Sequence, residues 1–395
     1  RTKASTCRSA LPHRKLRSNM FNMQNTALTI AGGAETFVHL YARPSQRLPV
    51  ANLITQVRTA PAPYGHIPVS FNDIDDAPTC QINCPSVGLR HHILGEGRQR
   101  RPGPLARAAL GLIARLAAPF LRCAGWDHQV QINNWLVSTN PTGDLDIATA
   151  RALTEHFADR HPSRAIVLRS LNDLRDIDLL YRLPELGFRL IPVRRVHLQV
   201  PADHPLAPEA GTPPDTEAGD FETGDFKTVD GRDFSHADFR RVEALYRDLH
   251  AGRAATLRPL YTAEFLEALV QTGVIQMTGL RDTAGTLQGI VAVLVRGDTM
   301  VIALRGYDPA HPSAAALGRL IVDIPAREAA RRGLYCNHGA VEFSHGCDLA
   351  SAIEYFAVCD RHLPRRRRLA GALIERVARR LAAQPTLQQC RVRKG

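Results

Sequence analysis

A glutamate between two histidines is the grouping best suited to proton transfer in this chain of 395 residues. Glu342 follows His338 and precedes His345, and the segment around it is typical of the end of a β-strand. A buried carboxylate with a raised pKa accepts a proton from a nucleophile, and histidine titrates near neutral pH. Glu342 and His345 are therefore candidate catalytic residues. A glutamate paired with an arginine at a strand edge, beside surface histidines, is the alternative interpretation.

Tyr307 and Glu354 are two further candidates for proton transfer. Tyr307 directly follows a β-type run and Arg305-Gly306. Its hydroxyl could protonate a leaving group, or it could serve as a packed, hydrogen-bonded core residue. Glu354 and Tyr355 are adjacent in a second β-type run, so their side chains point to opposite faces and only one can face a site.

Groups that could hold a ligand occur in both halves of the chain. Arg305 and Gly306 end a β-type run that precedes a loop and a helix, an order that places backbone amides where acyl and phosphate groups are held. Arg305 could also grip a phosphate, so both are candidate cofactor-binding residues. Asn133, Asn134 and Thr139 are candidate substrate-binding residues, although asparagine at a strand end more often satisfies a turn.

The elements that must position these residues form two stretches in which strands and helices alternate, which predicts an α/β fold. A helix break or kink is expected at Pro325. In the first stretch the patterns predict strands at 129–138, 165–169 and 188–200, with helices at 147–160 and 172–183. In the second stretch they predict strands at 274–280, 287–295, 299–304, 334–343 and 352–358, with helices at 236–250, 262–272, 314–332 and 365–383.

This element order resembles the GNAT acyltransferase fold, and two such halves in one chain resemble the FemAB-type branch. The local matches are Asn133–Asn140, Gly339–Phe343, Ile353–Tyr355 and Asp360–Pro364. The resemblance spans roughly residues 105 to 385. It implies tandem GNAT-like lobes, each a mixed, largely antiparallel sheet flanked by helices.

The resemblance also implies a reaction: transfer of an acyl group from acyl-CoA, as co-substrate, to an amine of a small molecule or peptide. The alternatives are a FemAB-like aminoacyl-tRNA-dependent transferase and a non-catalytic, ligand-binding member of the fold. The chain departs from the family pattern at two places. The loop after Arg305 holds a single glycine, and Ser344 stands where the family has a lysine.

Charge and composition divide the chain further. A poorly defined basic arm is expected over 1–65, a first GNAT-like lobe over 66–200, an acidic linker over 201–235, a GNAT-like acyltransferase lobe over 236–385 and a basic tail over 386–395. The linker holds nine acids against two bases, whereas 361–395 holds eleven Lys or Arg against one acid. The run Arg365–Arg368 could contact phosphates or tRNA, or it could be the solvated start of a helix.

The net charge of +12 favours an anionic partner such as tRNA, coenzyme A or a membrane surface. No run approaches the roughly 20 apolar residues of a membrane span, but the basic amphipathic stretch 105–121 could lie on a membrane or pack as a surface helix. Cys80, Cys84, His91 and His92 fit no standard zinc spacing, so no metal is expected. Scattered cysteines in a chain of this length favour a reducing cytoplasm.

Overall fold

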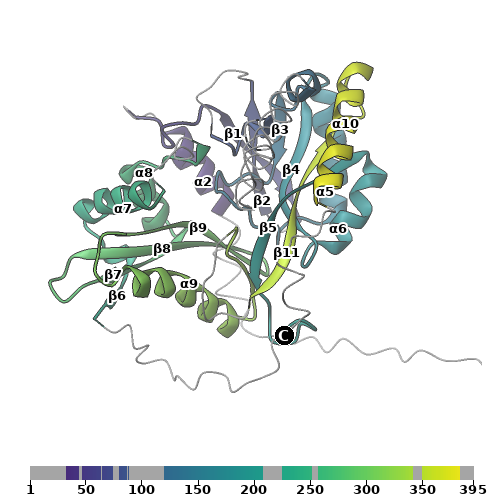
Figure 1. The fold of residues 1–395 in the computed structure, drawn as a ribbon. Helices are drawn as coiled ribbons and strands as arrows, with labels where there is room; N and C mark the ends of the chain where they lie inside the picture. Colours follow the sequence, from purple (N-terminus) through teal and green to yellow (C-terminus); the bar gives the residue numbers. More distant parts are fainter. Residues whose placement is uncertain are drawn as a thin grey trace, which may run out of the picture.

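The structure is a computed structural model that places most of the chain between residues 33 and 382. The helices and strands are arranged around a single sheet (Figure 1). The residues that it describes are 33–43, 47–63, 65–73, 80–86, 88, 120–207, 225–250, 257–340 and 349–382.

The described strands form one mixed, mostly antiparallel sheet of eleven strands in the order β1-β2-β3-β4-β11-β5-β10-β9-β8-β7-β6. Only β3 with β4 and β9 with β10 pair in parallel. The strands are β1 (Gln56–Ala62), β2 (Gly65–Asn72), β3 (Gln129–Ile132), β4 (Ala165–Asn172), β5 (Phe188–Gln199), β6 (Lys227–Asp230), β7 (Gln276–Arg281), β8 (Leu287–Arg296), β9 (Thr299–Tyr307), β10 (Tyr335–Asn337) and β11 (Ala350–Cys359).

The helices cover the sheet and begin where the sequence supplies caps. Asp146 accepts a hydrogen bond from the backbone of Thr149, and Thr262 caps its helix in the same way. Ser235 and Asp238 form a reciprocal capping box. The helices are α2 (Gly33–Ala42), α5 (Ile147–Arg160), α6 (Ile177–Arg182), α7 (His236–Leu249), α8 (Ala263–Gln271), α9 (Ala314–Arg331) and α10 (Arg365–Ala382), with short 3-10 turns at Leu183–Leu186 and Gly231–Asp233.

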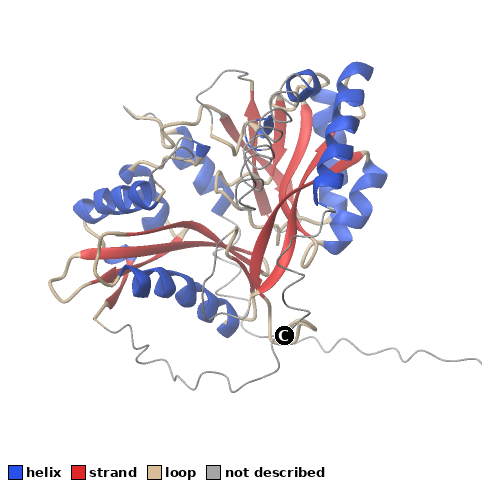
Figure 2. Ribbon diagram, in the orientation of Figure 1, coloured by secondary structure: helices blue, strands red, loops and turns tan. Residues whose placement is uncertain are grey.

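The sheet divides into two arms where β9 meets β10 (Figure 2). β10 pairs with β9 only from Tyr335 to Asn337. Beyond that point the chain after β10 stays with β5, because the His338 backbone N–H donates to His197 O. β9 instead stays with β8 as far as Tyr307. The two arms therefore diverge like the limbs of a V from this short parallel pairing.

The last strand joins the two halves. β11 lies between β4 and β5 of the first half, and its residues pair with both. The two predicted half-sheets are thus parts of one continuous sheet, because β11 is exchanged into the first half. α10 follows β11 and packs Ala370, Ile374 and Ala378 into the same cluster as Trp126 and Phe356.

Residues 33–62, which fall in the region predicted as a basic arm, hold α2 and β1. Phe37 and Leu40 of α2 are buried in the main core, which explains why this segment is folded against the sheet. Within the predicted acidic linker, β6 pairs with β7 at the edge of the sheet. The remaining boundaries of the predicted lobes stay predictions.

Several predicted elements differ in length. β3 ends at Ile132, so the strand predicted to Ser138 was wrong beyond that residue: Asn133 and Leu136 have positive φ angles of 57° and 55°, which no strand allows. The helix predicted from 172 begins only at Ile177, because β4 continues to Asn172. α9 runs through Pro325 without interruption.

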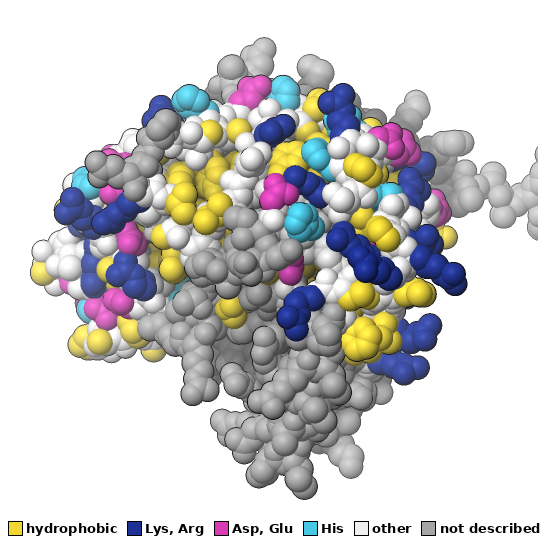
Figure 3. Space-filling model, turned by 90° about the horizontal axis from the view of Figure 1, so that it is seen from above, with side chains coloured by type: hydrophobic (Ala, Val, Ile, Leu, Met, Phe, Trp, Pro, Cys, Tyr) yellow, Lys and Arg dark blue, Asp and Glu magenta, His cyan; other side chains and the backbone are white. Residues whose placement is uncertain are grey.

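α10 carries an exposed apolar stripe. Its leucines follow the periodicity of a core-facing helix, yet Leu369 is 62% exposed and Leu373 and Val377 are 39% and 38% exposed. The helix packs inward through small residues instead: a Cβ at Gly371 would lie 2.9 Å from Cζ2 of Trp126. Figure 3 shows basic side chains with hydrophobic ones between them on the side where α10 lies. None of the helices in the described ranges is long and apolar enough to cross a bilayer.

Candidate functional site

Beyond Val301, one edge of β9 has no partner strand among the described residues, and it faces the region where the two arms diverge. From Ile302 to Tyr307 β9 pairs with β8 on one side, and no described strand pairs with it on the other. An unpaired strand edge presents alternating N–H and C=O groups that can bind an extended chain containing amides. The same stretch borders a small apolar cavity whose lining includes Trp135, Tyr261, Ala303 and Leu304.

In the first half of the chain the parallel strands β3 and β4 also diverge, and there the loop 133–142 fills the gap between them. β3 and β4 are parallel from Gln129 to Gln131, after which the chain turns into the loop 133–142. Arg169 of β4 donates to the carbonyl oxygens of Val137 and Ser138, at 2.9 and 3.4 Å. The Asn140 N–H donates to Ser170 Oγ at 2.9 Å. Of the two divergences, only that of the second half presents an unpaired edge among the described residues.

A row of charged side chains crosses the centre of the sheet beside this region. The neighbouring strands β4, β11 and β5 carry Arg169, Glu354 and Arg194, and β9 carries Arg305. Arg194 Nη2 lies 2.9 Å from Glu354 Oε2, and both side chains are largely buried. The same carboxylate acts electrostatically on Arg169. Glu354, predicted as a catalytic residue, therefore holds two arginines of the sheet.

Arg258, in the segment before α8, adds another positive charge to this row. Burial lowers the pKa of Arg305 to about 10, and repulsion by the guanidinium groups of Arg258 and Arg194 adds to this effect. Arg258 Nη1 lies 3.3 Å from His250 Nε2. Arg305 itself has no hydrogen-bond or ion-pair partner within the described ranges. This arginine cluster is defined by Arg169, Arg194, Arg258 and Arg305.

The loop 133–142, whose backbone is strained, holds Arg169 and Arg194 of the arginine cluster in place. Asn133, Leu136 and Ser170 all have positive φ angles. Leu136 is fixed because its N–H donates to Asn134 Oδ1 and its carbonyl accepts from the Tyr261 hydroxyl at 2.7 Å. Strain of this kind persists only where the surroundings determine the conformation. Here it aims the carbonyl oxygens of the loop at the guanidinium groups.

The predicted substrate-binding residues are part of that loop. Asn133 donates to Pro141 O and accepts from the Trp135 indole. Asn134 donates to Ser70 Oγ at 2.7 Å, and Thr139 Oγ1 accepts from Arg194. All three predicted residues are buried. Their polar atoms build the loop, and a role in binding substrate stays a prediction.

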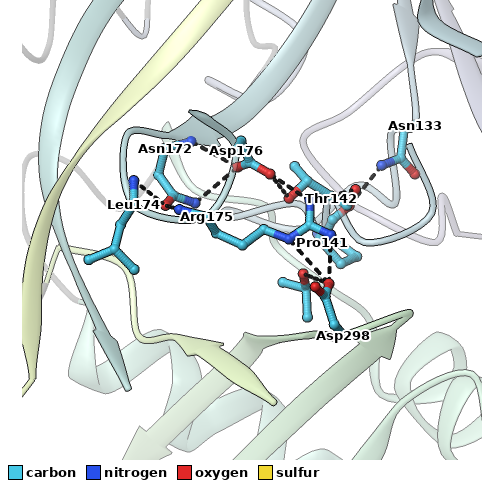
Figure 4. A network of polar contacts seen from close by, with 9 residues as sticks. Asn133, Pro141, Thr142, Asn172, Leu174, Arg175, Asp176 and Asp298 are labelled. Atoms are coloured by element: carbon cyan, nitrogen blue, oxygen red, sulfur yellow. Dashed lines mark hydrogen bonds and ion pairs between the residues drawn. The ribbon is translucent and has the colours of Figure 1, made fainter. Parts of the chain in front are cut away.

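A second polar network joins the loop to the other half of the sheet (Figure 4). Arg175, which follows β4, donates to Asp298 in the turn between β8 and β9 at 2.6 Å. It also binds the fully buried carboxylate of Asp176 at 2.7 Å. Asp176 in turn accepts from the Thr142 hydroxyl at 2.7 Å. These contacts fix the distance between the filled loop and the base of β9.

Two histidines beside the arginine cluster are held neutral. Burial and the nearby arginines lower the pKa of His250 and of His338 to about 3. A neutral imidazole can accept a hydrogen bond from Arg258, but it does not cancel the positive charge. His338 was expected to flank Glu342 as a proton carrier, and its lowered pKa makes it a poor base near neutral pH.

Because the pKa of His250 and His338 is lowered, we expect the folded protein to lose stability in mild acid. In the unfolded chain their pKa is near 6.5, so below that pH the unfolded state binds protons that the folded state excludes. The free energy of unfolding should fall as pH drops from about 6.5 toward 3, by up to about 1.4 kcal/mol per pH unit for each group. Urea midpoints between pH 7.5 and 4.5 measure this. His250→Gln should flatten the slope and the exposed control His156→Gln should not; equal slopes would contradict the assignment.

Gly306 has a packing role in addition to its predicted role in cofactor binding. A Cβ there would lie 2.7 Å from the backbone C of Leu245 and N of Tyr246 in α7. Only glycine lets α7 lie this close to β9. Tyr307, the next residue, packs against α9, where its hydroxyl lies near Gly318.

We expect Gly306→Ala to lower the free energy of unfolding by about 1–3 kcal/mol, because the added methyl group meets the backbone of α7 and not a mobile side chain. The control is Gly318→Ala in α9, whose Cβ would meet Tyr307 Oη at an ordinary 3.5 Å. That change should stabilise by up to about 1 kcal/mol, since alanine favours helix. Chemical denaturation of both variants tests the pair, and equal effects would count against close packing at Gly306.

Glu342 and His345 lie outside the described residues, as do His91, His92 and most of the stretch 105–121. Cys80 and Cys84 are both buried. No local sequence pattern singled out Arg169, Arg194 and Arg258. Their only signal was an arginine inside or beside an otherwise apolar segment, such as the one in AIVLRSLN of β4.

The chain is structurally similar to proteins with the GNAT fold. FemX is 7% identical, over 82% of this chain and 94% of that chain, with a TM-score of 0.40. L-PGS from Bacillus licheniformis is 12% identical, over 62% and 83%, with a TM-score of 0.36. A tandem GNAT protein from the clavulanic acid biosynthesis pathway is 14% identical, over 58% and 74%, with a TM-score of 0.33. The sequence matches no family profile and no curated protein.

At identities of 7–14% these likenesses concern the fold and not the substrate.

Proposed function

We propose that this protein transfers an acyl group from an acyl-CoA thioester to the amine of a small molecule or peptide. The free edge of β9 inside the V carries this proposal. An extended donor containing amide groups can pair with that edge. Its acyl group would then lie beside Arg305–Tyr307 and the apolar cavity, where backbone N–H groups can stabilise a developing oxyanion.

The protein's own groups then have defined tasks. The amine attacks the donor carbonyl, the C–N bond forms, and the bond to the leaving sulfur breaks. Glu342 or His345, both predicted from the sequence, would accept the proton that the amine loses. Tyr307, at the end of β9, would donate a proton to the leaving group.

The start of α9 does not suit the pyrophosphate of coenzyme A. The Ala310 N–H donates to Asp308 Oδ1 at 2.9 Å, and the Ser313 N–H donates to His311 Nδ1 at 3.1 Å. A carboxylate in this position also repels phosphate. The backbone N–H groups already used in this region are those of Ala310, His311, Ser313, Ala314, Ala316 and Leu317. The residues therefore fit the acyl arm of the donor but not its pyrophosphate at this helix.

That mismatch favours an aminoacyl-tRNA donor as the second candidate. Such a donor brings its phosphates to the protein's outer surface, and Arg365, Arg366 and Arg368 are exposed at the start of α10. Positive charge at a helix N-terminus is unfavourable for the helix dipole, so an anionic partner would stabilise it. Binding of tRNA should weaken steeply with salt if these arginines contact phosphates.

A comparison of the two donors tests the proposal. The full chain is incubated with amine acceptors and either a panel of acyl-CoAs or charged tRNA, and amide formation is followed by mass spectrometry. Thiol release that depends on the amine supports the acyl-CoA reaction. Amide formed only from charged tRNA, with a steep salt dependence, supports the second candidate. A ligand-induced thermal shift without product from either donor would identify a binding protein and reject both.

A further inference from the structure

The region where the two arms of the sheet diverge holds more positive charge than the residues around it cancel. The arginine cluster has four guanidinium groups, on Arg169, Arg194, Arg258 and Arg305. Glu354 is the carboxylate that pairs with it, through Arg194 at 2.9 Å. The ionisable neighbours that act on Arg258 are the phenol of Tyr246, which burial keeps neutral by raising its pKa, and the guanidinium of Arg194; no described carboxylate is among them. Within the part of the chain that the structure describes, four positive charges and one negative charge leave a surplus of three.

Neutral groups accept hydrogen bonds from these guanidinium groups, but they do not cancel the positive charge. Arg169 donates to the carbonyl oxygens of Val137 and Ser138. Arg258 lies 3.3 Å from the neutral imidazole of His250. Carbonyls and imidazoles accept hydrogen bonds but carry no negative charge. Buried surplus charge is costly, and burial already holds the pKa of Arg305 below its usual range.

The arginines also differ in how firmly they are held. Arg169 and Arg194 are bound to the loop 133–142, and Arg194 is also bound to Glu354. Arg305 has no partner within the described ranges, although it lies on a strand between residues fixed by β8. A positioned guanidinium without a partner is suited to bidentate binding of a carboxylate or phosphate. The start of α9, where such a group could otherwise bind, is already occupied by the chain's own side chains.

We propose that the arginine cluster binds an anionic group of the substrate, a carboxylate or a phosphate, through Arg305 and Arg258 at the open edge of β9. The inference rests on the proposed acyl transfer for its location beside the reacting groups. It adds a substrate class: an amine acceptor that also carries an anionic group. Arg194 and Glu354 position the cluster, and Arg305 makes the contact.

The binding test uses inorganic phosphate and acetate, each titrated into the full chain at constant ionic strength with chloride as the reference. Wild type should gain several degrees in Tm with at least one anion, because a ligand that binds only the folded state stabilises it. The larger response distinguishes a phosphate site from a carboxylate site. Arg305→Met should abolish the gain, whereas Arg151→Met, on the exposed face of α5, should retain it.

Arg305→Met also separates binding from folding. Replacing an unpaired, largely buried cation by an apolar side chain of similar length should leave Tm without anion unchanged or higher. If Arg305 were instead paired with Glu342 or Asp348 of the segment 341–348, its replacement would lower Tm. Wild type would then show no response to either anion. That result, or equal responses in both variants, would overturn the proposal.

Enzyme kinetics with two acceptors test whether this site binds the substrate of the reaction. For an acceptor with a carboxylate, Arg305→Met should raise KM by about 10- to 100-fold, the range expected for one charge-assisted hydrogen bond. For the methyl ester of the same acceptor KM should change little. An equal rise for both acceptors would contradict the assignment. Anion binding that survives in a protein without transferase activity would support the site while rejecting the proposed function.

Discussion

Replacing Glu354 by glutamine is expected to lower the free energy of unfolding by about 3–5 kcal/mol, because it leaves the buried charges of Arg194 and Arg169 without a carboxylate. Glu354 lies on β11 between two strands that each carry one of these arginines. Its carboxylate accepts from Arg194 Nη2 at 2.9 Å, and its side chain is 7% exposed. Urea denaturation at pH 7 measures the loss.

Two further variants make the Glu354 result specific. The exposed control Glu155→Gln on α5 should stay within about 0.5 kcal/mol of wild type. Adding Arg194→Met to Glu354→Gln should recover part of the loss, because it removes one of the unpaired charges. A Glu354→Gln protein with wild-type stability but greatly reduced turnover would restore the catalytic role predicted from the sequence.

Replacing Glu342 by glutamine should lower turnover by about 10²–10⁴-fold, the contribution typical of a positioned general base. The reason is chemical: an amine must lose a proton during acyl transfer, and a carboxamide cannot accept it. The measurement is kcat for amide formation with saturating donor and acceptor.

The matched control for Glu342→Gln is Asp348→Asn, an acid in the same segment of the sequence with no predicted role. A drop confined to Glu342→Gln supports the base. If the rate of Glu342→Gln is unchanged, Glu342 is removed from the mechanism, and His345→Gln becomes the variant to test.

Most of the strands and helices could be predicted from local patterns. Apolar periodicity and caps such as Asp146 and Ser235 specify α5 and α7 without reference to the rest of the chain. The pairing of the strands could not be predicted, because it joins residues far apart in sequence. Glu354 pairs with Arg194 across the exchanged strand β11, and no local signal places those residues together.

Two departures of the structure from the local sequence pattern have a common physical cause. The strand predicted through Ser138 was wrong because buried hydrogen bonds hold Asn133 and Leu136 in a left-handed conformation. The stripe of α10 that begins at Leu369 is exposed because Gly371 packs close to Trp126 instead. In both cases tertiary contacts outweigh the local pattern.

The candidate site was only partly accessible from the sequence. Arg305 and Tyr307 were found because they end a strand before a loop and a helix. Arg258 and Arg194 were missed, since a lone arginine in a sequence does not reveal which other arginines it meets. Charge surplus is a property of the folded cluster, and it becomes visible only when four strands and a loop are brought together.

The measurement that tests the central claim most directly is the structure of the full chain with a non-hydrolysable acyl donor and an amine acceptor. We predict that the acyl arm of the donor pairs with the free edge of β9, with its carbonyl within hydrogen-bond distance of a backbone N–H of Arg305–Tyr307. A donor bound elsewhere, with the edge of β9 paired by the chain's own residues, would contradict the proposed acyl transfer at this site.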